Sequence, residues 1–534
     1  MTRLTYHPLL FALYPFLFIY SNNLDEYPLF SDLYVPIALT LIACAAVLLV
    51  AYALLKDKSR AALVVSLCLI LFFSYGHVLQ ALRGSSVAFL KKTQHQQLLA
   101  AYGLFFCLAL FLICWIKNGL KEANLLLDVI SATLVAVCVF TVISFGFGAG
   151  PPEKAQSTLN GDIIPLSRPE RPPDIYFIVL DSYGSQSTMK DVYGYDSGEF
   201  IDHLRSEGFY VPLRSRSNYA FTFLSIASTL NMQQLTWLSD KVGKRSNNRK
   251  IPYQMIKDNT VMRSLKGIGY KYVQLKSGWQ GVGINPNADW NIECNGGDEL
   301  TNVIVQTTIL SAFESGIFGE YSKNRATGCH RRAKFLSCIF STVPEVQHRI
   351  TGPRFMFIHV PAPHPPYVFG PDGEEICTNM QIKEDENGAD SPGSGKSYRD
   401  QFIYVAKKTR EMVDRILAES ENPPVIIITA DHGHNIEEKM VREMNARKKI
   451  KSKYADMRLD HRMRIFSAYY MPGNRTENLY DSISPVNTFR VIFNTYFNTT
   501  YPPLADDSFY SDLTTPYLFT NVTKRIYAYP PPSV

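Results

Sequence analysis

The chain has 534 residues, of which 46% are hydrophobic, and a formal net charge of +6 at pH 7. This length exceeds that of one ordinary domain, and the composition excludes a disordered chain and gives no indication of a nucleic-acid partner. Most charged residues follow residue 150, so the sequence predicts an apolar first part and a more polar second part.

Long apolar runs fill the first part of the chain, and there are five of them: about 5–21, 31–54, 61–82, 98–116 and 125–148. Crossing a hydrocarbon core of about 30 Å takes about 20 helical residues, which most of these runs supply. The first run is the shortest, but no small-residue cleavage site follows it, and a further apolar run does. We therefore expect a bundle of about five transmembrane helices over residues 1–148.

Basic residues in the short loops indicate how this bundle is oriented. Arg3 and the loops 54–60 (LLKDKSR) and 117–124 (KNGLKEAN) are basic, whereas the loop after the first run is acidic. Basic loops stay in the cytoplasm, although the basic loop 83–92 fits this pattern less well. Five crossings then place everything after residue 150 outside the cytoplasm. The chain is predicted to be a multi-pass protein of an inner or plasma membrane, with an extracytoplasmic second part.

The cysteines divide in the same way. Five lie in the apolar runs, where a cysteine behaves as a small buried hydrophobe. The second part holds the other four: Cys294, Cys329, Cys338 and Cys377. In an oxidising compartment these four can form two disulfides, in any of three pairings.

The second part alternates strands with helices. Residues 149–173 are rich in proline, glycine and charge and are expected to be a linker, followed by one domain over 174–534. Short apolar runs of strand length occur at 174–181, 270–275, 354–360, 425–431 and 465–471, with amphipathic stretches typical of helices at 197–208 and 398–420. Strands of this kind are buried on both faces, as in a parallel sheet covered by helices. The pattern predicts a doubly wound α/β domain.

Several of these runs end in residues that can bind a metal or move a proton. Asp181 ends the first run, His359 lies near the end of the third, and Asp431 and His432 end the fourth, just before Gly433. Ligands of doubly wound sheets bind at the carboxyl ends of the strands. An aspartate in this position can also be a helix N-cap or a turn residue. Carboxylates and imidazoles that meet at one edge would form a metal site.

A candidate nucleophile lies in the stretch 217–230 (SNYAFTFLSIASTL), where Thr222, Ser225 and Thr229 fall at helical spacing. A hydroxyl within a helix usually bonds back to the preceding turn. At the start of a helix, however, a hydroxyl can be deprotonated with the help of a bound dication and can then attack phosphorus. The helix dipole favours the negative charge at that position.

Two further histidines stand near the predicted strand ends. His364 shares the proline-rich loop 357–373 with His359, and His461 stands just before the last predicted strand. Each is either a surface residue or a group that touches substrate oxygens or a metal.

Taken in this order, the motifs resemble the alkaline phosphatase/sulfatase superfamily. They are most similar to its membrane-anchored branch of lipoteichoic acid synthases and phosphoethanolamine transferases. The resemblance implies five membrane helices and an extracytoplasmic sulfatase-like domain. It implies that Asp181, Asp431 and His432 hold zinc or manganese, and that Thr222 is both a ligand and the nucleophile.

For the remaining histidines, the resemblance implies that His364 contacts the phosphate. His461 would contact substrate or hold a second metal, and the position of His359 near the end of its run predicts the same two alternatives for that residue. Two departures from the family patterns narrow the activity. No cysteine stands at position 222, which argues against the formylglycine chemistry of sulfatases, and Asp181 stands where the transferases usually have glutamate.

The activity implied is transfer of a phosphoryl-linked headgroup, of phosphoglycerol or phosphoethanolamine type, through a phosphothreonine. The donor would be a membrane phospholipid and the acceptor a cell-envelope glycan or lipid. A membrane-bound phosphodiesterase or sulfatase-like hydrolase is an alternative that the sequence does not separate from a transferase. A non-catalytic envelope assembly protein that keeps the fold is another.

Overall fold

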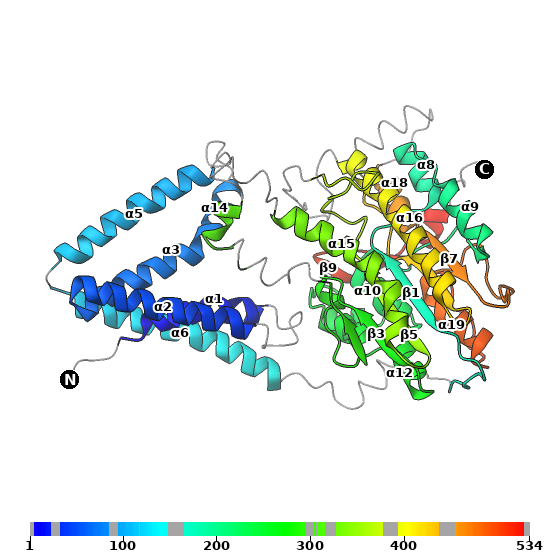
Figure 1. The fold of residues 1–534 in the computed structure, drawn as a ribbon, viewed down its shortest axis with the longest axis horizontal. Helices are drawn as coiled ribbons and strands as arrows, with labels where there is room; N and C mark the ends of the chain where they lie inside the picture. Colours follow the sequence, from blue (N-terminus) through cyan, green and yellow to red (C-terminus); the bar gives the residue numbers. More distant parts are fainter. Residues whose placement is uncertain are drawn as a thin grey trace. The chain divides into compact units, whose positions relative to one another are not determined.

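The computed structural model describes residues 5–22, 33–84, 94–116, 118–147, 165–294, 304, 307–314, 327–376, 394–436 and 454–527 (Figure 1). The chain divides into two compact units. The first unit comprises residues 1–151 together with 297–327, and the second comprises 152–296 together with 328–534. The chain thus returns from the second unit to the first before it completes the second.

The first unit is helical. Its helices are α1 (His7–Asn22), α2 (Tyr34–Leu55), α3 (Lys58–Gly84), α5 (His95–Trp115), α6 (Leu120–Phe147) and the short α14 (Leu310–Glu314). Four of the described helices, α2, α3, α5 and α6, are long and apolar enough to cross a membrane. The 16 residues of α1 extend about 24 Å, which is shorter than the hydrocarbon core of about 30 Å. The first apolar run therefore forms a helix, but one below the usual length of a span.

Polar side chains fix the start of α1 among its neighbours. His7 is fully buried; its Nδ1 lies 2.6 Å from Ser66 Oγ of α3 and its Nε2 lies 2.8 Å from Asn124 Oδ1 of α6. Asp128 of α6 accepts hydrogen bonds from the backbone N–H groups of Tyr6 and His7, each at 2.8 Å. These bonds satisfy amide groups that the first turn of a helix leaves without partners.

A seven-stranded sheet forms the centre of the second unit, in the order β2-β7-β6-β1-β5-β3-β4. The strands are β1 (Ile175–Leu180), β2 (Phe209–Tyr210), β3 (Lys271–Leu275), β4 (Trp290–Ile292), β5 (Arg354–Val360), β6 (Val425–Ala430) and β7 (Ser467–Tyr470). The five strands β6, β1, β5, β3 and β4 are parallel, whereas β7 runs antiparallel to β6 and β2 antiparallel to β7. The predicted run 465–471 is therefore a strand, but the sheet is mixed. An apolar run has the same appearance in either direction, so sequence alone does not give its pairing.

Helices cover both faces of this sheet, as a doubly wound α/β fold requires. Along β1, Tyr176, Ile178 and Leu180 point into one apolar core, and the alternate residues Ile175, Phe177 and Val179 point into the other. The first core is closed by α8 (Gln186–Tyr193), α9 (Gly198–Ser206), α15 (Thr327–Val346) and α16 (Ser394–Glu419). The second is closed by α10 (Thr222–Asn231), α11 (Lys250–Lys257), α12 (Thr260–Gly267) and α19 (Pro485–Tyr496). The period-2 alternation of a strand explains why β1 is apolar at every position.

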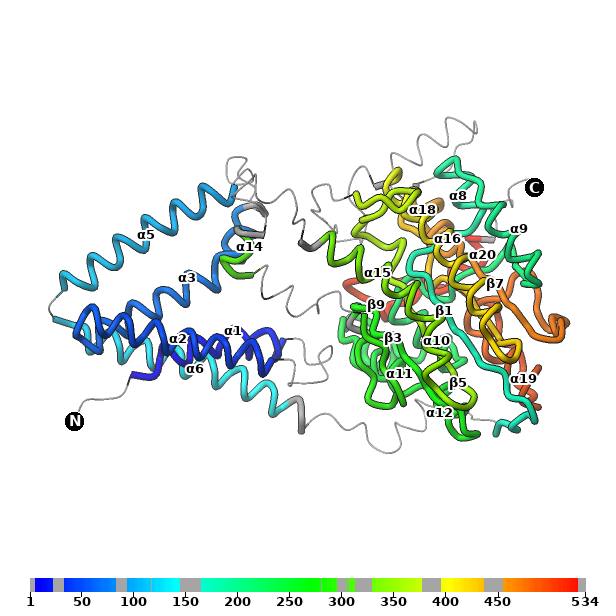
Figure 2. Tube along the Cα trace, viewed as in Figure 1, coloured from blue at the N-terminus to red at the C-terminus, as the bar shows by residue number. Residues whose placement is uncertain are grey.

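The remaining described elements are smaller. They are the helices α18 (Tyr454–Met463) and α20 (Thr523–Tyr527), the two-stranded sheet of β8 (Phe509–Asp512) and β9 (Thr515–Asn521), and short turns of other helix types at Ser239–Gly243, Gln280–Val282 and Gln347–Arg349. Figure 2 follows the same path as a Cα trace.

One disulfide joins the segment after β4 to α15. It links Cys294 to Cys338, with Cα atoms 5.7 Å apart, and Cys329 is also disulfide-bonded. Cys377 lies outside the described residues. The five cysteines of the apolar helices are free thiols, but only Cys44 and Cys138 are buried as predicted, whereas Cys68 is half-buried and Cys107 and Cys114 are exposed.

Candidate metal centre and nucleophile

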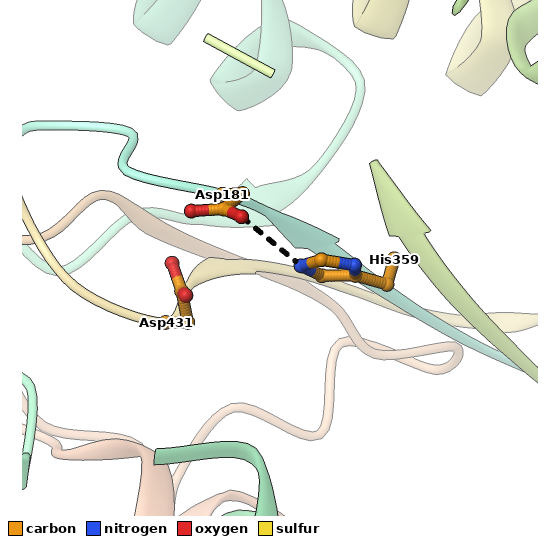
Figure 3. Close-up of side chains that lie close together, drawn as sticks. All are labelled: Asp181, His359 and Asp431. Atoms are coloured by element: carbon orange, nitrogen blue, oxygen red, sulfur yellow. Dashed lines mark ion pairs between the residues drawn. The ribbon is translucent and has the colours of Figure 1, made fainter. Parts of the chain in front are cut away.

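Three neighbouring parallel strands bring the central candidates together at one edge of the sheet. In the register of these strands, Leu180 of β1 is paired with Val360 of β5 and with Ala430 of β6. Asp181 and Asp431 each follow directly after these paired positions. His359 is the last residue but one of β5, and its partner on β1 is Val179. The side chains of Asp181, His359 and Asp431 point toward one another (Figure 3).

These three side chains form a compact buried group. One ligand atom from each of Asp181, His359 and Asp431 lies within 4.8 Å of the other two. His359 Nε2 is 3.5 Å from Asp181 Oδ2. Three buried atoms of the group, Asp181 Oδ1, His359 Nε2 and Asp431 Oδ2, have no hydrogen-bond partner among the described residues. Buried polar atoms are nearly always paired, and a shared cation would satisfy all three at once.

His432 and Thr222 extend this group. His432 Nε2 lies 3.3 Å from Asp431 Oδ2 and 3.8 Å from Asp181 Oδ1. Thr222 is the first residue of α10, and its Oγ1 lies 3.2 Å from His432 Nε2. The hydroxyl is therefore at the start of a helix, where the dipole and the first-turn amides favour a negative charge.

The tautomer of His432 follows from its neighbours. Its Nδ1 lies 3.1 Å from the backbone carbonyl oxygen of Gly433, which can only accept. Nδ1 therefore carries the hydrogen, and the Nε2 lone pair faces the site. Burial first, and then the positive charge of Arg462, holds the pKa of His432 well below its usual value. The imidazole is neutral at pH 7, which is the form that binds metals.

The two carboxylates have opposite pKa shifts. Burial and the negative charge of Asp181 raise the pKa of Asp431 to about 6. Burial also acts to raise the pKa of Asp181, but the nearby histidines, His364 foremost, outweigh it and hold that pKa below its usual value. Two adjacent buried carboxylates repel each other when both are ionised. A divalent cation between them would remove that repulsion.

Groups around the centre hold its side chains in place. The backbone N–H groups of Ser182 and His432 donate to Asp431 Oδ1, at 3.0 and 2.8 Å. Ser182 has a φ of 65°, an uncommon conformation for a residue other than glycine, and this turn brings its N–H to the carboxylate. Ser277 Oγ lies 3.0 Å from Nδ1 of His359 and fixes that ring. Such supporting bonds are typical of metal-binding histidines.

The donor set fits a divalent cation. Two carboxylates and two imidazoles, all buried, are ligands that zinc accepts and that manganese also accepts. The sequence-predicted ligands Asp181, Thr222, Asp431 and His432 all lie here. His359, predicted only as a possible second-metal or substrate contact, lies in the most compact group.

The other histidines near the site lie outside the compact group of Asp181, His359 and Asp431. His364 is partly buried, its backbone N–H donates to Asp181 O at 3.1 Å, and its charge affects the pKa of Asp181. His461 lies in α18, and its Nδ1 is 3.0 Å from Thr188 Oγ1. His434 is fully buried, hydrogen-bonded to Tyr193 and Tyr367 and stacked on Tyr398. The roles predicted for His364 and His461 stay predictions, and none is predicted for His434.

One further residue at the centre was not predicted from the sequence. Arg462 Nη2 lies 3.2 Å from His432 Nε2. Its guanidinium also donates to the carbonyl oxygens of Ala220, at 2.9 Å, and Gly433, at 3.2 Å. It presents a fixed positive charge to His432 Nε2, the atom that also lies 3.2 Å from Thr222 Oγ1. The only sequence signal was its position next to His461, because a single arginine has no diagnostic spacing.

Comparison with known proteins gives matches among solved structures only. No protein-family model matches the chain, and no curated protein matches its sequence. Among solved structures, it is similar to the C-terminal periplasmic domain of EcEptC from Escherichia coli in complex with Zn, with 10% identity, 65% of this chain and 93% of that chain covered, and a TM-score of 0.41.

Two other solved structures are similar over different lengths. One is the integral membrane protein lipooligosaccharide phosphoethanolamine transferase A (EptA) from Neisseria meningitidis, with 11% identity, 92% of this chain and 95% of that chain covered, and a TM-score of 0.36. The other is a protein in the alkaline phosphatase superfamily from Vibrio parahaemolyticus, with 11% identity, 65% and 74% covered, and a TM-score of 0.35. Because the TM-scores are low, the function is inferred from the site itself.

Proposed function

We propose that this protein is a membrane-bound, metal-dependent transferase. It moves a phosphoryl-linked headgroup, of phosphoglycerol or phosphoethanolamine type, from a membrane phospholipid to a cell-envelope glycan or lipid. Thr222 carries the group as a phosphothreonine between the two half-reactions. The observation that supports this most is the set of three unpartnered buried atoms, from Asp181, His359 and Asp431, beside a hydroxyl at a helix start.

Asp181, Asp431, His432 and His359 are the residues that would hold the cation. A divalent cation in this position supplies a Lewis acid, which lowers the pKa of a neighbouring hydroxyl and offsets negative charge on a phosphoryl group. Their buried positions exclude water and keep the ligand atoms in fixed places, so little rearrangement is needed at the moment of reaction.

The chemical steps use groups of this chain. Thr222 Oγ1 loses its proton and forms a bond to phosphorus, while the bond from phosphorus to the diacylglycerol oxygen breaks and that oxygen takes up a proton. In the second half-reaction, an acceptor hydroxyl forms the new bond to phosphorus and the Thr222 oxygen leaves. The start of α10 and the guanidinium of Arg462 favour the negative charge on the reacting oxygens. We assign His364, which is partly buried, the role of contacting the phosphoryl oxygens.

The helical unit supports a lipid donor. Four helices long and apolar enough to cross a bilayer keep the enzyme where phospholipids are. An enzyme that acted only on soluble phosphodiesters would not need this anchor. We infer that the catalytic unit lies on the extracytoplasmic side, in line with the basic loops at 54–60 and 117–124.

Intact-protein mass spectrometry tests the proposal. The full-length protein, loaded with zinc or manganese, is mixed with phospholipid vesicles and quenched in acid. We expect Thr222 to gain the mass of the transferred headgroup. Thr222→Val should abolish the adduct and Thr222→Ser should retain it, because only the hydroxyl is needed. Thr229→Val is the matched control, since that hydroxyl donates to Ser225 O at 2.8 Å within the same helix. Full turnover by Thr222→Val would refute the proposal.

The same experiment separates a transferase from a hydrolase. With an acceptor glycan or lipid present, a transferase leaves the headgroup on the acceptor, whereas a hydrolase releases it into water at the same rate with or without the acceptor. A protein that binds no zinc or manganese and forms no adduct would be a non-catalytic member of the fold.

A further inference from the structure

We call the first, helical unit the membrane unit and the second unit the catalytic unit. The described part of residues 297–327 packs within the membrane unit, although the chain on both sides of it belongs to the catalytic unit. Residues 152–296 and 328–534 belong to the catalytic unit. Between them, Ile304 and residues 307–314 are described, and the short helix α14 begins at Leu310. In the ribbon and the Cα trace, α14 lies beside α3 (Figures 1 and 2).

Apolar side chains and one backbone hydrogen bond hold this segment. Ala312 is fully buried and, with Ile309, belongs to a cluster that contains Tyr75 and Leu79 of α3 and Leu98 of α5. The backbone N–H of Ile309 donates to the carbonyl oxygen of Phe72 in α3, at 2.9 Å.

Ile304 packs in a second cluster, together with Phe16 of α1, Leu33 before α2 and Phe73 of α3. The helices α1, α3 and α5 and the residue that precedes α2 thus contribute to the surface on which the segment rests. Within α3, Tyr75 is fully buried and Leu79 is 5% exposed.

The contacted positions all lie at the same end of the helices. They fall in the second half of α1 and α3 and at the beginning of α2 and α5. The basic loop that contains Lys56 and Lys58 joins the opposite ends of α2 and α3. By the rule that basic loops stay in the cytoplasm, the segment meets the extracytoplasmic ends.

We propose that Ile304 and residues 307–312 are a docking element, by which the chain of the catalytic unit is anchored a second time to the extracytoplasmic ends of α1, α3 and α5. The catalytic unit is then attached through the linker after α6 and through this element. This second attachment does not depend on whether the short helix α1 spans the membrane. This inference does not depend on the proposed enzymatic function.

A cleavage experiment on the full-length protein tests the docking element. A protease site is inserted between residues 155 and 160, the protein is purified in mild detergent through an N-terminal tag, and the linker is cut. We expect the fragment that carries the catalytic unit to remain bound to the tagged helical fragment.

The double variant Ile309→Asn/Ala312→Asn should lower the retained fraction by about tenfold or more, because it removes buried apolar contacts from the docking element. Leu310→Asn is the matched control, because Leu310 is 43% exposed. The cleaved fragment of this variant should be retained as fully as that of the wild type.

Two results would overturn the proposal: wild-type fragments that separate after cleavage, or a double variant that is retained like wild type. Hydrogen exchange gives a second measurement that needs no variant. In the uncut protein, the amide of Ile309 should exchange slowly because it donates to Phe72 O, and fast exchange at that amide would also contradict docking. Thermal unfolding of the catalytic unit, measured in parallel, shows whether that unit stays folded in each variant.

Discussion

Gly433 is the position at which a single methyl group should do most damage to the metal centre. A Cβ added there would lie 2.2 Å from the carbonyl oxygen of His461, 2.7 Å from that of Arg464 and 3.2 Å from that of Arg462. Ordinary van der Waals contact begins at 3.4 Å, so the closest contact is short by 1.2 Å (3.4 minus 2.2). All three atoms belong to the backbone, which cannot turn away as a side chain can.

The expected cost of Gly433→Ala follows from that overlap. Overpacking in a rigid site typically costs about 1–3 kcal/mol, and a clash with backbone on this scale should cost about 3 kcal/mol or more. For a unit of this size, the loss corresponds to a fall in melting temperature of about 4 °C or more. Metal content should fall as well, because Asp431 and His432 directly precede Gly433, whose N–H donates to Arg462 O at 2.7 Å.

The assay compares thermal unfolding and bound metal in purified protein. Gly267→Ala is the matched control: Gly267 is the last residue of α12, and its added Cβ meets nothing within 4 Å. That variant should melt as the wild type does or slightly higher, because alanine favours a helix over glycine by up to about 1 kcal/mol. The reasoning is refuted if Gly433→Ala melts within about 2 °C of wild type and keeps its metal.

Three further outcomes are expected of the centre. Zinc or manganese affinity, measured by calorimetry between pH 5 and 8, should be nearly level above pH 7. It should fall by up to about tenfold per pH unit below pH 6, because a proton competes for Asp431, whose pKa burial and Asp181 raise to about 6; an affinity independent of pH would contradict this. Ser277→Ala should weaken metal binding by about 10–100-fold, since it releases the ring of His359, and unchanged affinity would show that Ser277 has no positioning role. Arg462→Gln should lower turnover by about 10²-fold at unchanged metal content, and Arg462→Lys should recover part of it. Wild-type turnover in Arg462→Gln would show that the charge of Arg462 does not contribute to the reaction.

Local sequence patterns determined much of the architecture. Runs of about 20 apolar residues can only be satisfied in a bilayer as helices, and four such helices are present. Strands buried on both faces leave a signal of consecutive apolar residues, and the run 354–360 coincides with β5. Asp181 and Asp431 could be proposed as partners because carboxyl ends of parallel strands meet at one edge.

Other features depended on contacts between distant parts of the chain. Neither the antiparallel direction of β7 nor the place of Arg462 beside His432, 30 residues away in sequence, leaves a local pattern. His359 was ranked below His432 from motif alone, yet its Nε2 completes the compact group because β5 is the direct neighbour of β1.

The return of the chain to the membrane unit is another feature that depends on contacts between distant parts of the chain. Residues 307–314 are a short, mildly apolar stretch, which by itself is typical of any surface turn. The packing of Ile309 and Ala312 on α3 and α5 is what identifies the stretch as a docking element. Sequence by itself determined which elements form, because periodicity and burial are local properties. Only the tertiary structure decided which side chains meet, because meeting depends on the pairing of strands and the packing of helices far apart in the chain.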